Sequence, residues 1–264
     1  MFLGFDIGNT STVIGLYDRN SVAPVRTGRY KTGKRMKPEK LAGNILAFLG
    51  EDTQAFITGA AFSSVVPEIN KTYHRVLMNE FSVKSLEISH SCSLGITINY
   101  TDPGELGVDR IVNAVAAHSE YSGNLIIIDI GTAATFCVML ANGEFDGGLI
   151  APGIGTTIKA LARRASNLPE IIFEKPDRLV ARDTENALKS GFFYGWAGLI
   201  DGIIDRIVDE YGSDFRILLS GGYAEIISRN IRHENTVDTL LTMKGIKYIY
   251  DLNRGGSSPA AART

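Results

Sequence analysis

Two copies of one short pattern constrain the fold of this chain more than any other feature of its sequence. In each copy an apolar run ends at an aspartate, an isoleucine and a glycine follow, and a second apolar segment begins within a few residues. The copies span residues 1–17 and 124–139, with Asp6 and Asp129 at equivalent places. An apolar run that stops at Asp and Gly indicates a buried strand, a tight turn and a second strand. Repetition at a separation of about one small domain predicts two similar halves with a cleft between them.

The turn in each copy carries groups that suit a phosphate. Gly131 has no Cβ, so the backbone there can come close to a ligand. Thr132 and Thr135 add hydroxyl groups, and the N–H groups of the turn add further donors. One carboxylate opposite such donors suits a phosphate that is held through a metal ion. The alternative is a pair of ordinary hairpins, in which Asp and Gly serve turn geometry alone.

Composition and charge narrow the functional classes. The chain has 264 residues, of which 44% are hydrophobic and 21% charged, as in a soluble globular protein. The formal net charge of −2 gives no reason to expect nucleic acid or a membrane as a partner. Asp6 interrupts the first apolar run, which argues against a signal peptide, and no apolar stretch has the length of a bilayer span. The two cysteines, Cys92 and Cys137, are too few for a disulfide framework, so we expect a reducing compartment and a cytoplasmic protein.

Apolar spacing predicts an alternation of strands and helices, which is typical of an α/β fold. Helices are expected from Pro38, from Pro67 to about Phe81, from 107–110 onward, over 156–165, over 187–208 and from Ala224. Strands are expected within 54–66, near 83–88, at 96–100, at 215–220 and, as the final element, near 247–250. We place an N-terminal half at residues 1–118, a C-terminal half at 119–253 and a disordered tail at 254–264.

Three segments each allow two interpretations. Residues 26–40 are strongly basic, which suits either a phosphate or nucleic-acid contact or a solvated strand and loop. The helix at 187–208 is so apolar that it needs burial, either in the core or in a dimer interface. The pair Gly221 and Gly222 follows a strand, where it either lets an adenosine lie against the backbone or forms a simple strand-to-helix turn.

The start of the helix after residue 107 is a candidate catalytic position. Asp109 suits the N-cap of a helix, where free N–H groups stabilise a carboxylate. If it instead faces a ligand, it can orient a substrate hydroxyl and accept its proton late in phosphoryl transfer. Arg110 has a planar guanidinium suited to a carboxylate or phosphate, or to a surface salt bridge. His90 and Cys92 lack the rest of a nucleophilic arrangement, so we interpret both as structural.

The motifs together resemble the type III pantothenate kinase family. They are the D-x-G-N-T at residues 6–10, G-V-D-R at 107–110, D-x-G-T-A-x-T at 129–135 and G-G-x-I-x-P-G at 147–153. The resemblance covers essentially the whole chain apart from the tail. It implies an α/β fold of duplicated ribonuclease H-like (actin-like) domains with a cleft between them, in the acetate and sugar kinase/Hsp70/actin superfamily.

The resemblance also implies an activity and its cofactors. The activity is ATP-dependent phosphorylation of pantothenate to 4'-phosphopantothenate, the first step of coenzyme A biosynthesis, by in-line transfer with an aspartate base. ATP or another nucleoside triphosphate would be the donor. Mg2+ and a monovalent cation, K+ or NH4+, would be required, and the enzyme would be a homodimer.

Residue roles follow from the resemblance by position. Asp109 would be the base, and the pantothenate contacts would be Tyr100, Gly107, Val108, Asp109, Arg110 and, across a dimer interface, Thr184. The ATP contacts would be Asp6, Ile7, Gly8, Asn9, Thr10, Ser11, Thr12, Val13, Thr132, Gly221 and Gly222. Asp129 would bind the monovalent cation, and Asp6 would bind Mg2+.

The sequence departs from the family pattern at three positions, and two other functions stay open. Cys137 stands where an Asp is usual, Ser220 where a Thr is usual, and Asp183 where an Asn is usual. The Cys137 exchange is compatible with a non-catalytic regulatory protein on the same nucleotide-binding scaffold. A small sugar or polyol kinase is the other alternative, although an Arg beside the base fits an acidic substrate better.

Overall fold

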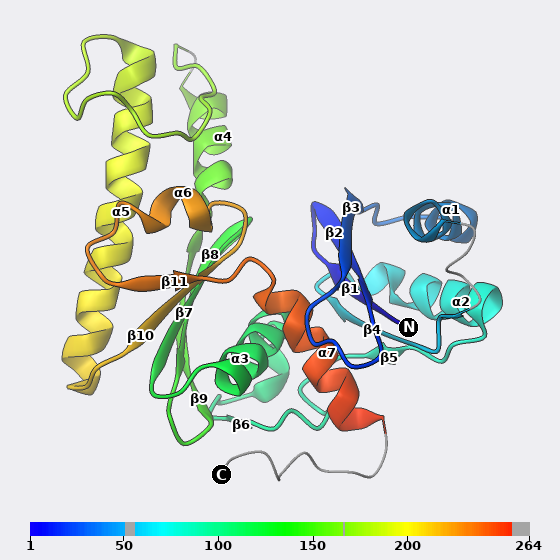
Figure 1. Ribbon diagram of the computed structural model, residues 1–264. Coiled ribbons are helices and arrows are strands. Elements are labelled where there is room, and N and C mark those ends of the chain that lie inside the picture. The colour runs from blue at the N-terminus through cyan, green and yellow to red at the C-terminus, as the bar shows by residue number, and fades with distance from the viewer. Residues whose placement is uncertain (51–55, 166, 255–264) are drawn as a thin grey trace. The chain divides into compact units, whose positions relative to one another are not determined.

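The computed structural model in Figure 1 describes residues 1–50, 56–165 and 167–254. These residues form two compact units. Unit 1 comprises residues 1–119 together with the C-terminal segment that begins at Leu240, and unit 2 comprises residues 120–239. The predicted disordered tail falls, apart from Arg254, on residues outside the described part of the chain.

Unit 1 is built on a mixed sheet with the strand order β3-β2-β1-β4-β5. Its strands are β1 (Phe2–Ile7), β2 (Ser11–Tyr17), β3 (Arg26–Lys31), β4 (Gly59–Ser64) and β5 (Leu86–Glu87). β2 runs antiparallel to both β1 and β3, whereas β4 runs parallel to β1. One face of the sheet is covered by α1 (Pro38–Leu49) and α2 (Asn70–Phe81), which pack on Leu3, Phe5 and Ile7. The prolines at 38 and 67 stand at the first positions of α1 and of the short 3-10 helix η2 (Pro67–Ile69) that precedes α2, as predicted.

Five strands of unit 2 repeat this order as β9-β8-β7-β10-β11. Its strands are β7 (Leu125–Ile130), β8 (Ala133–Met139), β9 (Glu144–Pro152), β10 (Arg216–Ser220) and β11 (Asn235–Val237). β7 has the same sequence of buried and half-buried positions as β1, and again pairs antiparallel with the next strand and parallel with β10. The predicted duplication is therefore confirmed at the level of strand order and strand direction, although the turn after β7 is one residue shorter: Asp6 pairs with Val13, and Asp129 pairs with Thr135.

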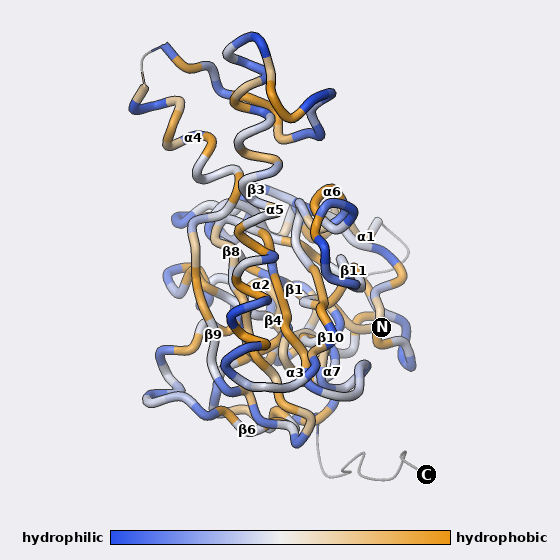
Figure 2. The backbone as a smooth tube through the Cα atoms, turned by 90° about the vertical axis from the view of Figure 1, so that its left-hand side faces the viewer, coloured by the Kyte–Doolittle hydropathy of each residue, from blue (hydrophilic) through white to orange (hydrophobic). Residues whose placement is uncertain are grey.

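The helices of unit 2 cover one face of its sheet. They are α4 (Ile154–Arg164), α5 (Thr184–Tyr211) and α6 (Ala224–Ser228), and they enclose a core with Ile126, Ile128 and Ile130. Figure 2 shows the central strands in hydrophobic colours, consistent with burial on both faces. The predicted helices at 156–165 and 187–208 are thus confirmed, the second of them with a longer span.

The C-terminal element differs from its prediction. Residues 247–250 were expected as a strand, but they belong to the helix α7 (Leu241–Asn253). This helix packs on β1 and β4, so the last segment of the chain returns to unit 1. It covers the face opposite α1 and α2, where a Cβ added at Gly4 would lie 3.3 Å from Ile246 Cγ2.

The remaining elements lie between β5 and β7 in the sequence. They are β6 (Thr97–Ile98), the 3-10 helix η3 (Pro103–Glu105) and α3 (Val108–Glu120). Asp102 caps η3 by accepting a hydrogen bond from Gly104 N at 2.8 Å, which is the turn chemistry that the Asp-Pro-Gly sequence predicts. Within the described ranges, no helix is both long enough and apolar enough to cross a membrane.

Substituting Ala for Gly245 should destabilise the protein. A Cβ at this position of α7 would lie 1.9 Å from the carbonyl oxygen of Val112 on α3, a distance that backbone atoms must relieve by moving. We expect a loss of about 3 kcal/mol in the free energy of unfolding, measured by urea denaturation. The control is Gly43→Ala on α1, where no atom lies within 4 Å and Ala should be neutral or stabilising by up to about 1 kcal/mol. Equal stability of the two variants would contradict the close packing of α7 on α3.

Candidate active site

The turn between β1 and β2 is held in one conformation by hydrogen bonds on both sides. Gly8 N donates to Ser11 O at 3.2 Å within the turn, and Thr32 N, just beyond β3, donates to Thr10 O at 3.1 Å. Asn9 and Thr10 are exposed at its tip. The turn therefore offers an accessible backbone surface of fixed shape beside Asp6, as a phosphate site requires.

A buried chain of hydroxyl groups anchors the same turn to the core of unit 1. Thr12 Oγ1 lies 2.9 Å from Thr32 Oγ1, and Tyr73 OH donates to Thr12 at 3.4 Å. Tyr73 OH in turn lies 2.8 Å from Tyr30 OH. Burial raises the pKa of both phenols above the ordinary value for tyrosine, with the neighbouring phenol adding to the shift at Tyr30, so both stay protonated and keep their hydrogen bonds. Thr12, which was predicted as an ATP contact, is fully buried, and its hydroxyl joins the turn to the core of unit 1.

Asp6 stands at the end of β1 in a row of residues that crosses the sheet. Its neighbours in register are Val13 on β2 and Ser63 on β4. Ser63 is 1% exposed, and its hydroxyl has no hydrogen-bond partner among the described residues. In unit 2 the same place beside Asp129 is taken by Ser220, on the parallel strand β10. Sequence reasoning did not single out Ser63, although the serine pair that ends its strand is a signal for this position.

The turn between β7 and β8 is enclosed by two glycines from distant parts of unit 2. A Cβ at Gly153, at the start of α4, would lie 2.1 Å from Gly131 O. A Cβ at Gly221 would lie 2.5 Å from Asp129 Oδ1 and 2.6 Å from Ile130 O, and Gly221 has a φ of +89°, a value that L-residues rarely adopt. Gly153 is thus packed closely against the backbone of a neighbouring element. Thr132 is exposed and its carbonyl accepts a hydrogen bond from Thr156 Oγ1 at 2.6 Å.

The predicted substrate residues at the start of α3 come together in unit 1. Asp109 lies in the first turn of α3, and its Oδ1 accepts a hydrogen bond from Arg110 N at 2.9 Å. The carboxylate lies over Gly107, where a Cβ would come within 2.5 Å of Oδ1. Arg110 is only 4% exposed; its Nη1 donates to Tyr100 OH at 3.4 Å and its guanidinium lies 5.8 Å from the centre of the Tyr100 ring. A buried guanidinium is not the surface salt bridge that was the alternative for Arg110.

The helix α7 contacts both the sheet of unit 1 and the helix α3 that carries Asp109. The helix α7 runs antiparallel to β1. Tyr250 packs at Gly59, which pairs with the first residue of β1, and Met243 packs at Gly15, which is nearer the turn. Thr242, at the N-terminal end of α7, donates to Asn113 on α3 at 2.7 Å, one helical turn after Asp109. The helix α7 therefore links the strand that carries Asp6 to the helix that carries Asp109.

Other predicted residues are placed as follows. Thr184 is exposed at the first position of α5, next to the cap Asp183, whose pKa is lowered by hydrogen bonds from Asn186. Figure 1 shows this end of α5 projecting, with the end of α4, beyond the sheet of unit 2. Gly222 is exposed with open space around it. Cys137 is buried on β8, paired with Ile127 of the strand that carries Asp129. The apolar neighbour suits a cysteine at this position.

The protein ligands available near the first turn fit a magnesium ion that is bound mainly through the phosphate groups of a nucleotide. Among the residues that the structure describes, no three His, Cys, Asp or Glu side chains gather as a metal cage. Mg2+ commonly binds through one or two carboxylates together with substrate phosphates and waters. Asp6, beside a turn with exposed backbone, provides a single carboxylate of this kind.

Fold and site geometry define the class of the protein. Two sheets that share the order of five strands, each with an Asp near the end of its central strand, form a duplicated, actin-like α/β architecture. A crystal structure of a ROK family glucokinase from Streptomyces griseus has this fold, with a TM-score of 0.55 over 97% of this chain and 99% of that chain, at 14% identity.

Sequence comparison gives the family. A family model described as type III pantothenate kinase matches residues 2–206. Proteins named type III pantothenate kinase from Koribacter versatilis and Brevibacillus brevis are 35% and 40% identical to the chain. The first alignment covers 97% of both chains, and the second covers 96% of this chain and all of its relative. The chain belongs to the type III pantothenate kinase family, and the predicted family and fold class are confirmed.

Proposed function

We propose that this protein transfers the γ-phosphoryl group of ATP to the primary hydroxyl of pantothenate, the activity for which its family is named. The observation that carries the proposal is the cluster of Tyr100, Asp109 and Arg110 at the start of α3. It places a carboxylate beside a buried guanidinium, and pantothenate has both a hydroxyl to be phosphorylated and a carboxylate to be bound. A neutral polyol has no carboxylate for this guanidinium to bind, so it fits the cluster less well.

Each part of the cluster has a distinct task in this mechanism. Asp109 orients the substrate hydroxyl and accepts its proton late in the transfer, when the bond to the γ-phosphorus is largely formed. Arg110, held by Tyr100, binds the substrate carboxylate and so fixes the hydroxyl in line with the phosphoryl group. Asp6 and the turn at residues 7–13 hold the phosphate groups, and bound magnesium would supply further neutralisation of their charge.

The second Asp-containing turn has a related task. Asp129, Thr132 and Gly221 lie around one turn of unit 2, with a carboxylate oxygen close to the backbone of Gly221. We assign Asp129 to a monovalent cation, K+ or NH4+, and Thr132 to the nucleotide phosphates. Gly221 and Gly222 would leave room for the adenosine to lie against the backbone.

A coupled assay of ADP release tests the activity. Turnover should require pantothenate, Mg2+ and K+ or NH4+, and should be absent with glucose or glycerol as the acceptor. Mass spectrometry of the product should show one added phosphoryl group. Turnover with a polyol instead of pantothenate would favour a sugar kinase, and nucleotide binding without any acceptor-dependent turnover would favour a regulatory protein.

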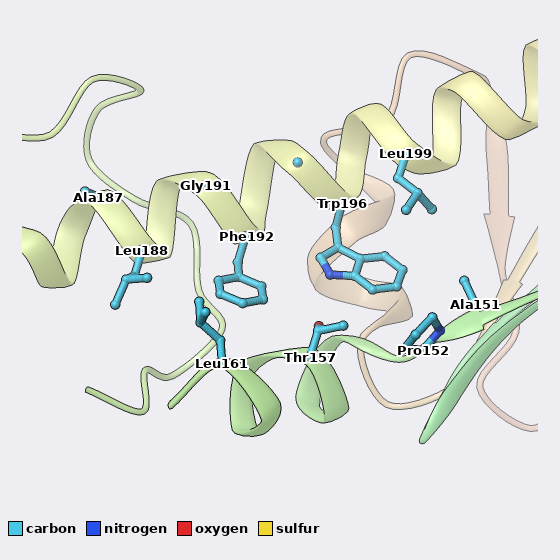
Figure 3. Close-up of a pocket in the computed structure, with 11 residues that line it drawn as sticks. Ala151, Pro152, Thr157, Leu161, Ala187, Leu188, Gly191, Phe192, Trp196 and Leu199 are labelled. Atoms are coloured by element: carbon cyan, nitrogen blue, oxygen red, sulfur yellow. The ribbon is translucent and has the colours of Figure 1, made fainter. Parts of the chain in front are cut away.

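The outer surface of unit 2 suits a homodimer. An apolar cavity of about 430 Å3 lies between α4 and α5. Figure 3 shows Trp196, Phe192 and Leu161 projecting into it. Leu161 and Leu199 are 37% and 38% exposed at its edge. A second copy of the chain that covers this surface would remove it from water.

The glycines of α5 support the same interface. Gly191, Gly195 and Gly198 have open space where a Cβ would stand, so no packing within the described chain explains them. Each costs about 1 kcal/mol relative to Ala in a helix interior. The close approach of another backbone, such as the same helix of a second copy, would account for this cost. The projecting first turn of α5 would then bring Thr184 to the substrate site of the partner.

Leu199→Glu should dissociate the dimer. A carboxylate in the centre of an apolar interface would be buried without a partner, so we expect the affinity between subunits to fall by at least about a hundredfold. Sedimentation equilibrium measures this change. Asp209→Ala on the same helix, at an exposed position outside the cavity, is the control and should leave the dimer intact. A monomeric wild-type protein would refute the proposed assembly.

A further inference from the structure

The edge strand β3 carries two positively charged side chains, Arg29 and Lys31, that do not contribute to the packing of unit 1. Side chains alternate between the two faces of a strand, so Arg26, Gly28 and Tyr30 share one face and Arg29 and Lys31 the other. Arg26 is used structurally, because it lies over Phe48 and donates to Leu49 O at 3.1 Å. Arg29 and Lys31 are exposed and form no ion pair with any residue in the described ranges.

The register between β2 and β3 places Arg29 and Lys31 beside the turn that follows Asp6. Lys31 pairs with Ser11, the first residue of β2 after the turn, and Arg29 pairs with Val13. Val13 pairs in turn with Asp6, so Arg29, Val13 and Asp6 form one row on one face of the sheet. Two strand spacings separate the backbones of Arg29 and Asp6 by about 10 Å.

The side chain of Arg29 already extends toward the turn. Its Nη1 lies 3.5 Å from Ser11 Oγ. The distance is at the limit of a hydrogen bond, so the guanidinium is close to the turn but weakly held there. A phosphate bound at the turn would be within reach of this group.

The turn itself supplies no positive side chain. Residues 6–12 contain no Lys or Arg, whereas residues 26–37 contain six basic residues and no acidic one. One magnesium ion neutralises only part of the charge of a triphosphate. Phosphate groups are bound preferentially by guanidinium and ammonium groups, which form charge-assisted hydrogen bonds.

We propose that Arg29 and Lys31 bind the phosphate groups of the nucleotide, in place of the lysine that other phosphate-binding loops carry within the turn. The proposal rests on the assignment of the first turn to ATP, and extends it to a strand outside that turn. Arg29 binds from the row that contains Asp6, and Lys31 binds from beside Ser11. Neither forms an ion pair with a described residue, so their charges are available to attract the nucleotide.

Charge-neutral variants test the proposal by nucleotide binding as well as by activity. Arg29→Gln and Lys31→Gln should each weaken the binding of Mg–AMPPNP, measured by calorimetry, by about tenfold, and the double variant should weaken it further. The dependence of the dissociation constant on salt should decrease with each lost charge. Binding of adenosine, which has no phosphate, should not change.

Two matched controls separate charge from fold. Lys40→Gln removes the same charge from the same basic segment, but on α1, which covers the opposite face of the sheet; its nucleotide affinity should equal that of the wild type. Lys31→Arg should restore binding. Unchanged affinity of both neutral variants for Mg–AMPPNP would overturn the proposal even if the protein phosphorylates pantothenate. Charge-dependent binding of Mg–AMPPNP in a protein inactive on pantothenate would support it and refute the proposed activity.

Discussion

Asp109→Asn should reduce turnover with pantothenate by a factor of about 10²–10⁴, the range that general-base groups contribute. The amide oxygen of Asn can still accept the hydrogen bond from Arg110 N, so the first turn of α3 should keep its conformation. The change removes the proposed proton acceptor and leaves the guanidinium that we propose as the ligand of the substrate carboxylate. We therefore expect kcat to fall while the KM for pantothenate changes by only a few fold.

The control for this experiment is Asp102→Asn. Asp102 lies in the same segment and caps η3, but it has no contact with Arg110 in the described structure. The variant should turn over at the rate of the wild type. If Asp109→Asn also kept the wild-type kcat, with circular dichroism and the melting temperature unchanged, Asp109 could not be the base.

Gly221→Ala should have the second largest effect, on stability and on nucleotide binding together. The added methyl group would lie 2.5 Å from Asp129 Oδ1, and Ala would have to adopt a φ of +89°. Backbone strain and overpacking together should cost about 3 kcal/mol of unfolding free energy. Displacement of the Asp129 carboxylate should also weaken the response of activity to K+.

The adjacent glycine provides the comparison. Gly222 has no atom within 4 Å of the position of a Cβ, so Gly222→Ala should leave the unfolding free energy within about 0.5 kcal/mol of the wild type. Both variants are measured by urea denaturation and by calorimetry with Mg–AMPPNP. Equal stability of the two variants would show that Gly221 does not pack against the turn as described.

The sequence predicts the two turns well because local chemistry determines them. An apolar run followed by Asp, Ile and Gly can be buried, then turn, then pair antiparallel with the next apolar segment, and both copies do so. The start of α3 is predicted for the same reason, since Gly107 and Asp109 are local signals for a helix start. The family resemblance adds roles to these residues that spacing alone does not give.

Features that depend on tertiary contacts are not predicted. Residues 247–250, Lys-Tyr-Ile-Tyr, have strand-like composition, yet Met243, Ile246 and Ile249 recur at helical spacing and are buried together in α7. Burial of that stripe outweighs the local preference for a strand. The strand β9 was likewise not predicted, because its glycines suggest a loop; Gly148 in fact lies against Phe136 O, where a Cβ would come within 1.9 Å. Asp6 lies beside Ser63 and in one row with Arg29 because of the register between neighbouring strands of the sheet, which the sequence alone does not show.

The return of α7 to unit 1 has a consequence for synthesis. The β-strands of unit 1 leave the ribosome early, but the helix that covers one face of their sheet is translated last, after all of unit 2. Until then the nascent protein exposes the glycine-lined side of that sheet, and unit 2 is free to fold in the interval. A ribosome stalled before residue 240 should therefore carry a protease-resistant middle segment behind an N-terminal segment that is still digestible.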